Sequence, residues 1–191
     1  VIEARNASQT FFQVGFNRRF APLMMKMMGR INKLPGPRII LIRVNAGFIE
    51  QTHWVHLANE GGGRILGEVC HFVDIARHIA QNPIVSVQAE AASSSSRLAD
   101  DVSLQLTFLD GSIATIVYTG RGNNGMGKEL IEVYVSGTIA VIDDFRNLTI
   151  SIDGKKETTK ISQDKGFANF IRAFVDSVCA GEPGPINEHE L

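Results

Sequence analysis

The sequence is poor in the features that mark disulfide-rich and metal-binding proteins. Its 191 residues include only two cysteines, Cys70 and Cys179, which lie far apart and belong to no recognisable motif. Two such cysteines exclude a disulfide framework and supply too few ligands for a cysteine-based zinc site. We expect both to be buried thiols in a reducing compartment, which predicts a cytoplasmic protein.

An excess of charge of one sign is also lacking, since 19 Lys and Arg residues face 20 Asp and Glu residues. The resulting net charge of −1 argues against a protein built to hold nucleic acid or an anionic membrane. No apolar run approaches the roughly eighteen residues of a membrane-spanning helix. His53 and His56 could share a metal, but no third ligand follows with useful spacing, so we predict packing or surface histidines and no metal site.

What the sequence does contain is an ordered succession of helix and strand patterns. Apolar spacing and end signals predict three helices, over residues 21–31, 64–80 and 167–180. Runs of β-branched and aromatic residues predict eight strands, over 10–16, 38–44, 84–90, 102–109, 112–119, 129–136, 138–143 and 147–152. Short turns between the later strands predict antiparallel pairing, because parallel neighbours need long crossovers.

This order predicts an α+β fold in a single domain spanning residues 1–191. We expect one large, mainly antiparallel open sheet with helices over one face. The strand over 112–119 carries apolar residues on both alternations, more than a one-sided sheet needs. We therefore expect the other face of the sheet to be buried against a second copy of the chain, giving a homo-oligomer.

The predicted helix over 64–80 has a polar stripe opposite its apolar sector. At 100° per residue, the apolar sector contains Ile65, Leu66, Val69, Phe72, Val73, Ala76 and Ile79. The opposite sector contains Gly67, Glu68, His71, Asp74 and His78. A solvated face with local charge pairs would explain this stripe, and so would a functional site. The functional interpretation is favoured by the glycine triplet before the helix and by His71, which titrates near neutrality beside Glu68.

Two other places carry candidate binding residues. Arg18 and Arg19 follow Asn17 at the end of the first predicted strand, where alternation sends the two arginines to opposite sides. One of them could hold an anionic or polyhydroxy ligand, or both could form surface salt bridges. Trp54, in the loop before the glycines, could wall a pocket and stack on a ligand or anchor that loop in the core.

Residues 120–125 match the dinucleotide-binding pattern G-x-G-x-x-G by letter. That motif works only where a helix N-terminus follows the glycines and meets the pyrophosphate. Here the residues over 129–136 predict a strand instead. We therefore interpret 120–125 as a mobile hairpin loop, without a dinucleotide site.

Several of these segments resemble a known family. Residues 15–22 (GFNRRFAP), 61–74 (GGGRILGEVCHFVD) and 128–145 (KELIEVYVSGTIAVIDDF) look like the C-terminal domain of the Gfo/Idh/MocA oxidoreductases. Within that family they look closest to the branch found in two-part dehydrogenases. The resemblance extends over roughly residues 10–185, and the segment from the glycine triplet to His71 is its most specific part.

The resemblance implies a two-domain enzyme. An N-terminal Rossmann domain would hold NAD or NADP, and the C-terminal domain would supply part of the substrate pocket and a sheet for oligomerisation. The implied substrates are sugars, sugar nucleotides, inositols or related polyols. The family also implies an Asp and a His four residues apart on one helix. His71 matches the His, whereas Gly67 stands where the Asp would be and Glu68 follows it.

We therefore expect the chain to be the substrate-binding and oligomerisation portion of an NAD(P)-dependent oxidoreductase. Its Rossmann domain is absent from the sequence, which begins at Val1 without a leader, so we expect a portion of a longer chain that is inactive by itself. The alternative is a non-catalytic ligand-binding or assembly module with the same fold. The expected catalytic residues are His71 and Glu68, and the expected substrate-binding residues are Asn17, Arg18 and Trp54.

Overall fold

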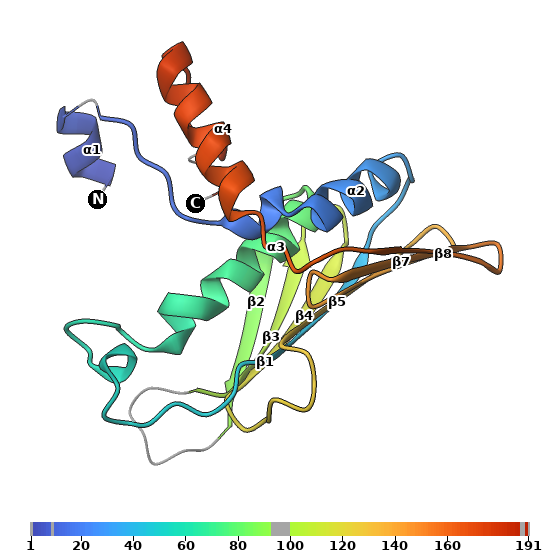
Figure 1. Ribbon diagram of the computed structural model, residues 1–191, viewed down its shortest axis with the longest axis horizontal. Coiled ribbons are helices and arrows are strands. Elements are labelled where there is room, and N and C mark those ends of the chain that lie inside the picture. Colours follow the sequence, from blue (N-terminus) through green and yellow to red (C-terminus); the bar gives the residue numbers. More distant parts are fainter. Residues whose placement is uncertain (1, 9, 93–99, 188–189, 191) are drawn as a thin grey trace.

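The computed structural model describes residues 2–8, 10–92, 100–187 and 190. Eight strands form one sheet in the order β2-β3-β4-β1-β5-β6-β7-β8 (Figure 1). They are β1 (Ile39–Asn45), β2 (Ile84–Ala91), β3 (Val102–Phe108), β4 (Ile113–Thr119), β5 (Glu129–Val135), β6 (Thr138–Asp143), β7 (Asn147–Ile152) and β8 (Lys155–Lys160). Only β1 and β4 pair in parallel, and the other neighbours are antiparallel. The predicted α+β fold with one mainly antiparallel open sheet is confirmed.

The connection between β4 and β5 is not a hairpin, because β1 lies between these two strands. The glycine-rich segment over 120–128 instead crosses the end of β1. Asn45 holds it there, since its Nδ2 donates hydrogen bonds to the carbonyls of Asn123 (2.7 Å) and Met126 (3.1 Å). The expected hairpin at 120–125 is therefore wrong, whereas the strand expected after the glycines is confirmed as β5.

Two strand predictions differ from the structure. Residues 10–16 form no strand and pair with none in the described part of the chain, and Phe11 and Phe12 remain exposed. Conversely, the polar segment Lys155–Lys160 forms β8, the last strand of the sheet, although its sequence has no apolar alternation. A tight turn with positive φ at both Asp153 and Gly154 returns the chain onto β7, which is the turn geometry that suits a two-residue hairpin.

Two helices cover one face of the sheet (Figure 1). The helix α2 (Pro22–Ile31) contacts β6 and β7, and α3 (Cys70–Ala80) contacts β1 and β4. Their apolar faces and the inward-pointing strand residues form one core, which includes Met24, Met27 and Phe72. A short helix not predicted from the sequence, α1 (Ile2–Ser8), precedes them.

The last predicted helix, α4 (Phe167–Ala180), forms but does not lie on the sheet. It packs against the 3₁₀ turn η1 (Asn17–Phe20), where the rings of Phe20 and Phe170 lie 5.6 Å apart, and it projects away from the sheet (Figure 1). None of its residues is buried. A helical pattern therefore predicted the helix correctly but could not specify which surface its apolar side would meet.

The helix predicted over 64–80 starts with a π-helical turn, η3 (Ile65–Val69), before α3 begins. A π-turn is wider than an α-turn, so the residues in it are out of phase with a 100° wheel. Ile65 and Leu66, which we expected in the buried sector, are 40% and 72% exposed. Ile75, outside the expected sector, is fully buried instead.

The two cysteines are unbonded, and neither is fully buried. Cys70 is half-buried and its Sγ lies 3.0 Å from the carbonyl of Leu66, while Cys179 is exposed on α4. The expectation of two buried thiols is therefore wrong, because no segment within the described ranges covers the side of α4 that carries Cys179. None of the described helices is long and apolar enough to cross a membrane.

A glycine controls the junction between η1 and α4, and its replacement is the clearest test of this fold. Gly166 has φ +83°, and an added Cβ would collide with the backbone of Asn17, Phe20 and Ala21. We expect Gly166→Ala to lower the free energy of unfolding by more than about 2 kcal/mol, from backbone strain and steric overlap together. Gly154→Ala is the matched control, because Gly154 also has positive φ (+74°) but open space around it. Equal losses in urea unfolding would contradict the proposed close packing.

Candidate functional site

The helix α3 contacts β1 and β4, and the ring of Phe72 in its first turn lies 6.4 Å from that of Tyr118 near the end of β4. Charged and polar side chains from four segments meet there. We call this group the polar cluster, and it consists of Arg18, Glu68, His71, Lys128 and Glu129.

Glu129 is the anchor of the polar cluster and is fully buried. Arg18 donates to it through Nε (2.8 Å) and Nη2 (2.9 Å), and Lys165 Nζ lies 2.6 Å from Oε1. Burial raises the pKa of Glu129, but the hydrogen bonds and charges of Arg18 and Lys165 outweigh that effect and lower it. Glu129 therefore remains ionised and holds both cations in place.

Glu68 forms the second ion-pair centre of the polar cluster. Lys128 Nζ lies 3.0 Å from its Oε2, and Arg64 Nη2 lies 3.5 Å from its Oε1. Arg64 is fully buried, donates to the carbonyl of Gly47 at 2.7 Å and lies over the ring of Tyr118. Burial raises the pKa of Glu68, yet Lys128 and Arg64 lower it overall, so the carboxylate stays charged.

His71 lies among these charges with one ring nitrogen unpaired. Its Nδ1 is buried and has no hydrogen-bond partner among the described residues. Phe16 packs edge-on against the imidazole, with ring centroids 5.6 Å apart. Burial, followed by the charge of Arg18, lowers the pKa of His71 to about 4 against the opposing charges of Glu129 and Glu68. The imidazole is therefore neutral at pH 7 and able to accept a proton.

The structure brings three of the five predicted site residues, His71, Glu68 and Arg18, into the polar cluster. Arg18 is committed to Glu129, and its guanidinium also lies 5.0 Å from the centre of the Phe72 ring. Asn17 is buried and donates from Nδ2 to the carbonyl of Lys165 at 2.7 Å, while its Oδ1 has no partner among the described atoms.

Trp54 lies on the short turn η2 (Trp54–His56) and is 57% exposed. It therefore does not anchor the loop in the core, and its stacking role stays a prediction. His56, next to it, is buried and its Nε2 lies 2.9 Å from both carboxylate oxygens of Asp100. Within the described ranges, no three His, Cys, Asp or Glu residues are grouped to hold a metal.

The rest of the polar stripe is not a solvated face. Asp74 is buried and pairs with Arg19, whose Nη2 lies 2.6 Å from Oδ1. His78, one turn further, is mostly buried, and burial lowers its pKa to about 4. The interpretation of the stripe as a set of exposed charge pairs is therefore wrong for Asp74 and His78.

Sequence reasoning missed Lys128, Glu129 and Arg64. Glu129 did carry a signal, because it occupies an inward position of a strand whose other inward residues are Ile131, Val133 and Val135. A charged residue at such a position requires a buried partner. Arg64 lies four residues before Glu68, a spacing that allows an ion pair but does not reveal that Arg64 is buried, whereas the partner of Lys128 lies 60 positions away.

Comparison with known proteins agrees with this architecture. A family model described as the GFO/IDH/MocA C-terminal domain matches residues 37–142, more than half of the 191 residues. The chain belongs to this family. The match includes β1, the glycine triplet, all of α3 and the strands through most of β6.

Solved structures share the fold of this GFO/IDH/MocA domain at low sequence identity. A dehydrogenase (MviM) from Clostridium difficile has a TM-score of 0.79 at 20% identity, over 99% of this chain and 60% of its own. The aldose-aldose oxidoreductase from Caulobacter crescentus, solved with glycerol, has a TM-score of 0.83 at 16% identity, over 99% and 60%. The UDP-N-acetylglucosamine 3-dehydrogenase GnnA from Acidithiobacillus ferrooxidans has a TM-score of 0.76 at 18% identity, over 96% and 57%.

The chain thus spans about 60% of the length of these solved proteins. No curated protein matches the sequence. At these identities the solved structures establish the fold of the GFO/IDH/MocA domain, and function has to be argued from its site.

The lowered pKa of His71 predicts a pH dependence of stability. The unfolded histidine has a pKa of about 6.5, whereas the folded one is about 4. Between these values the unfolded chain binds a proton that the folded chain excludes, so stability falls as the pH falls from 6.5 toward 4. His71→Asn should remove about 1–2 kcal/mol of this loss between pH 7 and 4.5, less than the full linkage value because the ring is partly exposed.

Urea unfolding of both proteins at the two pH values measures this difference. His78→Asn is a second test of the same effect, because burial lowers the pKa of His78 to about 4 as well, and this variant should remove its own part of the acid-induced loss. If His71→Asn kept the entire acid-induced loss, the pKa of His71 would not be lowered in the folded chain.

Proposed function

We propose that this chain is the substrate-binding and assembly part of an NAD(P)-dependent oxidoreductase that acts on a hydroxyl group of a sugar, sugar nucleotide or polyol. The observation that carries the proposal is His71, a neutral imidazole with an unpaired buried nitrogen beside the ionised carboxylate of Glu68. Membership of the GFO/IDH/MocA C-terminal domain family supports it. Two of the structurally similar proteins carry names that refer to an aldose and to a sugar nucleotide.

The proposed role of this chain is proton transfer. His71 would take the proton of the substrate hydroxyl during oxidation and return it during reduction. Glu68 carries the negative charge that favours a protonated imidazole, whereas Arg18 opposes it. Arg64 and Lys128 keep Glu68 ionised and fix its position, so the proton affinity of His71 also depends on these two ion pairs.

The nicotinamide cofactor does not fit the glycine-rich loop of this chain. Residues 120–125 lead into β5 and the loop crosses β1, so no helix N-terminus is offered to a pyrophosphate. We assign cofactor binding to a separate Rossmann domain, in agreement with the resemblance and with the greater length of the solved relatives. The 191-residue chain by itself should therefore show no NAD(P)H-dependent turnover.

The test is His71→Asn in the protein that includes the cofactor domain. We expect the rate to fall by about 100-fold or more, because general acid–base catalysis contributes on that order. The thermal midpoint at pH 7 should change little, since the folded imidazole is uncharged there. His53→Asn removes an exposed imidazole outside the polar cluster and should keep the wild-type rate.

An unchanged rate in His71→Asn would remove His71 from the reaction. It would favour the second candidate, a non-catalytic ligand-binding or assembly module, which the glycine at position 67 already suggests. The two candidate functions also predict different activities for the unmutated full-length protein. Only an oxidoreductase oxidises NAD(P)H in the presence of an aldose or ketose.

We also propose that the uncovered face of the sheet pairs with a second copy of the chain. The strand register places Ile113, Ile39, Tyr134 and Ile139 in one row across β4, β1, β5 and β6 on that face. Ile39 and Ile139 are 44% and 40% exposed, and no described helix lies on this side (Figure 1). Such a continuous apolar row is typical of an interface.

Ile139→Lys should therefore shift the chain toward monomer, because it introduces a charge at the β6 end of this row. Sedimentation at tens of micromolar should show a dimer or larger assembly for the wild type and a smaller species for the variant. Val87→Lys is the control, since Val87 is 60% exposed on β2 but opposite Leu106 on the helix side of the sheet. A monomeric wild-type chain would contradict the interface.

A further inference from the structure

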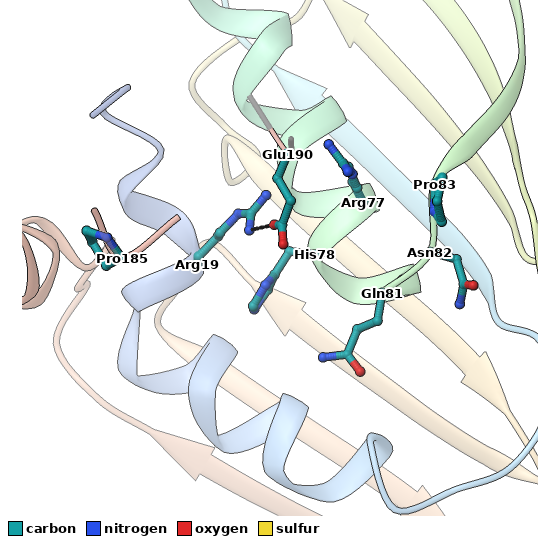
Figure 2. Close-up of a pocket in the computed structure, with 8 residues that line it drawn as sticks. All are labelled: Arg19, Arg77, His78, Gln81, Asn82, Pro83, Pro185 and Glu190. Carbon is teal, nitrogen blue, oxygen red and sulfur yellow. Dashed lines mark hydrogen bonds and ion pairs between the residues drawn. The ribbon is translucent and has the colours of Figure 1, made fainter. Parts of the chain in front are cut away.

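A cavity lies at the C-terminal end of α3, away from the polar cluster. It has a volume of about 390 Å³ (Figure 2), within the range used by small-molecule sites. The last turn of α3 and the following residues form one side of it, and Arg19 of η1 and Glu190 form the other. None of the residues assigned to the proposed reaction lines this cavity.

Glu190 places a carboxylate in the cavity, where it pairs with Arg19 Nη1. Figure 2 shows this carboxylate between the side chains of Arg19 and His78. The two partners differ in exposure, because the Arg19 side chain is 7% exposed and that of Glu190 is 38% exposed. The cation is therefore built into the fold, while the anion is the accessible member of the pair.

The other contacts of Arg19 explain why the cation stays in place. The carboxylate oxygens of Asp74, on α3, lie 2.6–2.9 Å from Nε and Nη2 of the Arg19 guanidinium. The third nitrogen of the guanidinium, Nη1, is on the cavity side and pairs there with the carboxylate of Glu190. A guanidinium that is held on one side presents a preorganised donor to an anion on the other.

A second guanidinium and two amides add to this anion-binding character. Arg77 lines the same cavity and forms no ion pair with any acidic residue in the described ranges. Gln81 and Asn82 lie across the cavity from Glu190 (Figure 2). A carboxylate alone fills only part of such a volume, so the remaining space and the amides suit a ligand with further polar groups.

We propose that this cavity binds a small anion that carries a carboxylate or phosphate group, and that Glu190 is an internal competitor which the ligand displaces from Arg19. Carboxylates and phosphates share the same binding chemistry, because both accept paired hydrogen bonds from a guanidinium. The proposal does not depend on hydride transfer, since its residues lie outside the polar cluster.

Isothermal titration calorimetry at pH 7 and low salt tests this, with inorganic phosphate and succinate as separate probes. Glu190→Gln removes the competing charge and keeps the side-chain shape, so it should bind at least one probe about tenfold more tightly than the wild type. Arg77→Gln should weaken the same binding by about tenfold, the typical effect of losing one charge-assisted hydrogen bond.

Arg172→Gln on the exposed surface of α4 is the matched control, because it makes the same charge change away from the cavity. Its affinity should equal that of the wild type. Tighter binding of phosphate than of succinate would indicate a phosphorylated ligand, and the reverse a carboxylic acid.

Three outcomes would overturn the proposal. The first is no binding of either probe by the wild type and Glu190→Gln at tens of millimolar. The second is an affinity in Glu190→Gln that is equal to or below that of the wild type, and the third is an equal loss in Arg77→Gln and Arg172→Gln. Thermal midpoints recorded for each variant show that the chains compared are folded.

Discussion

Two adjacent arginines on one short turn hold the described structure together. Arg18 pairs with the buried Glu129 of β5, and Arg19 pairs with the buried Asp74 of α3. The 3₁₀ geometry of η1 directs the two guanidinium groups to different elements, so one turn joins the sheet to the helix above it. Loss of one partner from such a pair leaves an uncompensated buried charge, which is far more destabilising than loss of an exposed ion pair. The same turn also receives α4 through Asn169, whose Nδ2 donates to the carbonyl of Phe20.

The environment of His71 follows from this arrangement. If Arg18 moved away, the buried carboxylate of Glu129 would lose the hydrogen bonds from its guanidinium. The positive charge of Arg18 is therefore a permanent part of the site. The burial of the ring and that positive charge keep the imidazole neutral, and the charges of Glu129 and Glu68 oppose them. The proton affinity of His71 is thus a balance between two ion pairs, and a bound substrate that changes the solvent or the charges around them would shift it. A buried ionic network of this kind serves function better than stability, because hydrophobic replacements of similar size are often no less stable.

The π-helical turn at the start of the α3 region has a direct effect on this site. It rotates Ile65 and Leu66 outward, while Glu68 turns toward Arg64 and Lys128. π-turns occur frequently at functional sites, where they place side chains that a regular α-helix could not. In this chain the turn places the carboxylate of Glu68 within reach of Arg64, four residues earlier, and of Lys128 from a distant segment. The sequence pattern could not reveal it, since the apolar spacing was counted at the α-helical period.

The sequence by itself determined the class of the fold, most of its elements and the family. Local patterns were sufficient for β1 to β7, α2 and α4, because periodic apolar residues and turn residues act within a few positions. Local patterns also singled out His71, Glu68 and Arg18. Only the tertiary structure decided that residues 10–16 pair with no described strand, that the polar segment of β8 extends the sheet, and that Glu129, Arg64 and Lys128 complete the site. The reason is that pairing of strands and burial of charge depend on partners far away in the chain, which residue spacing alone does not encode.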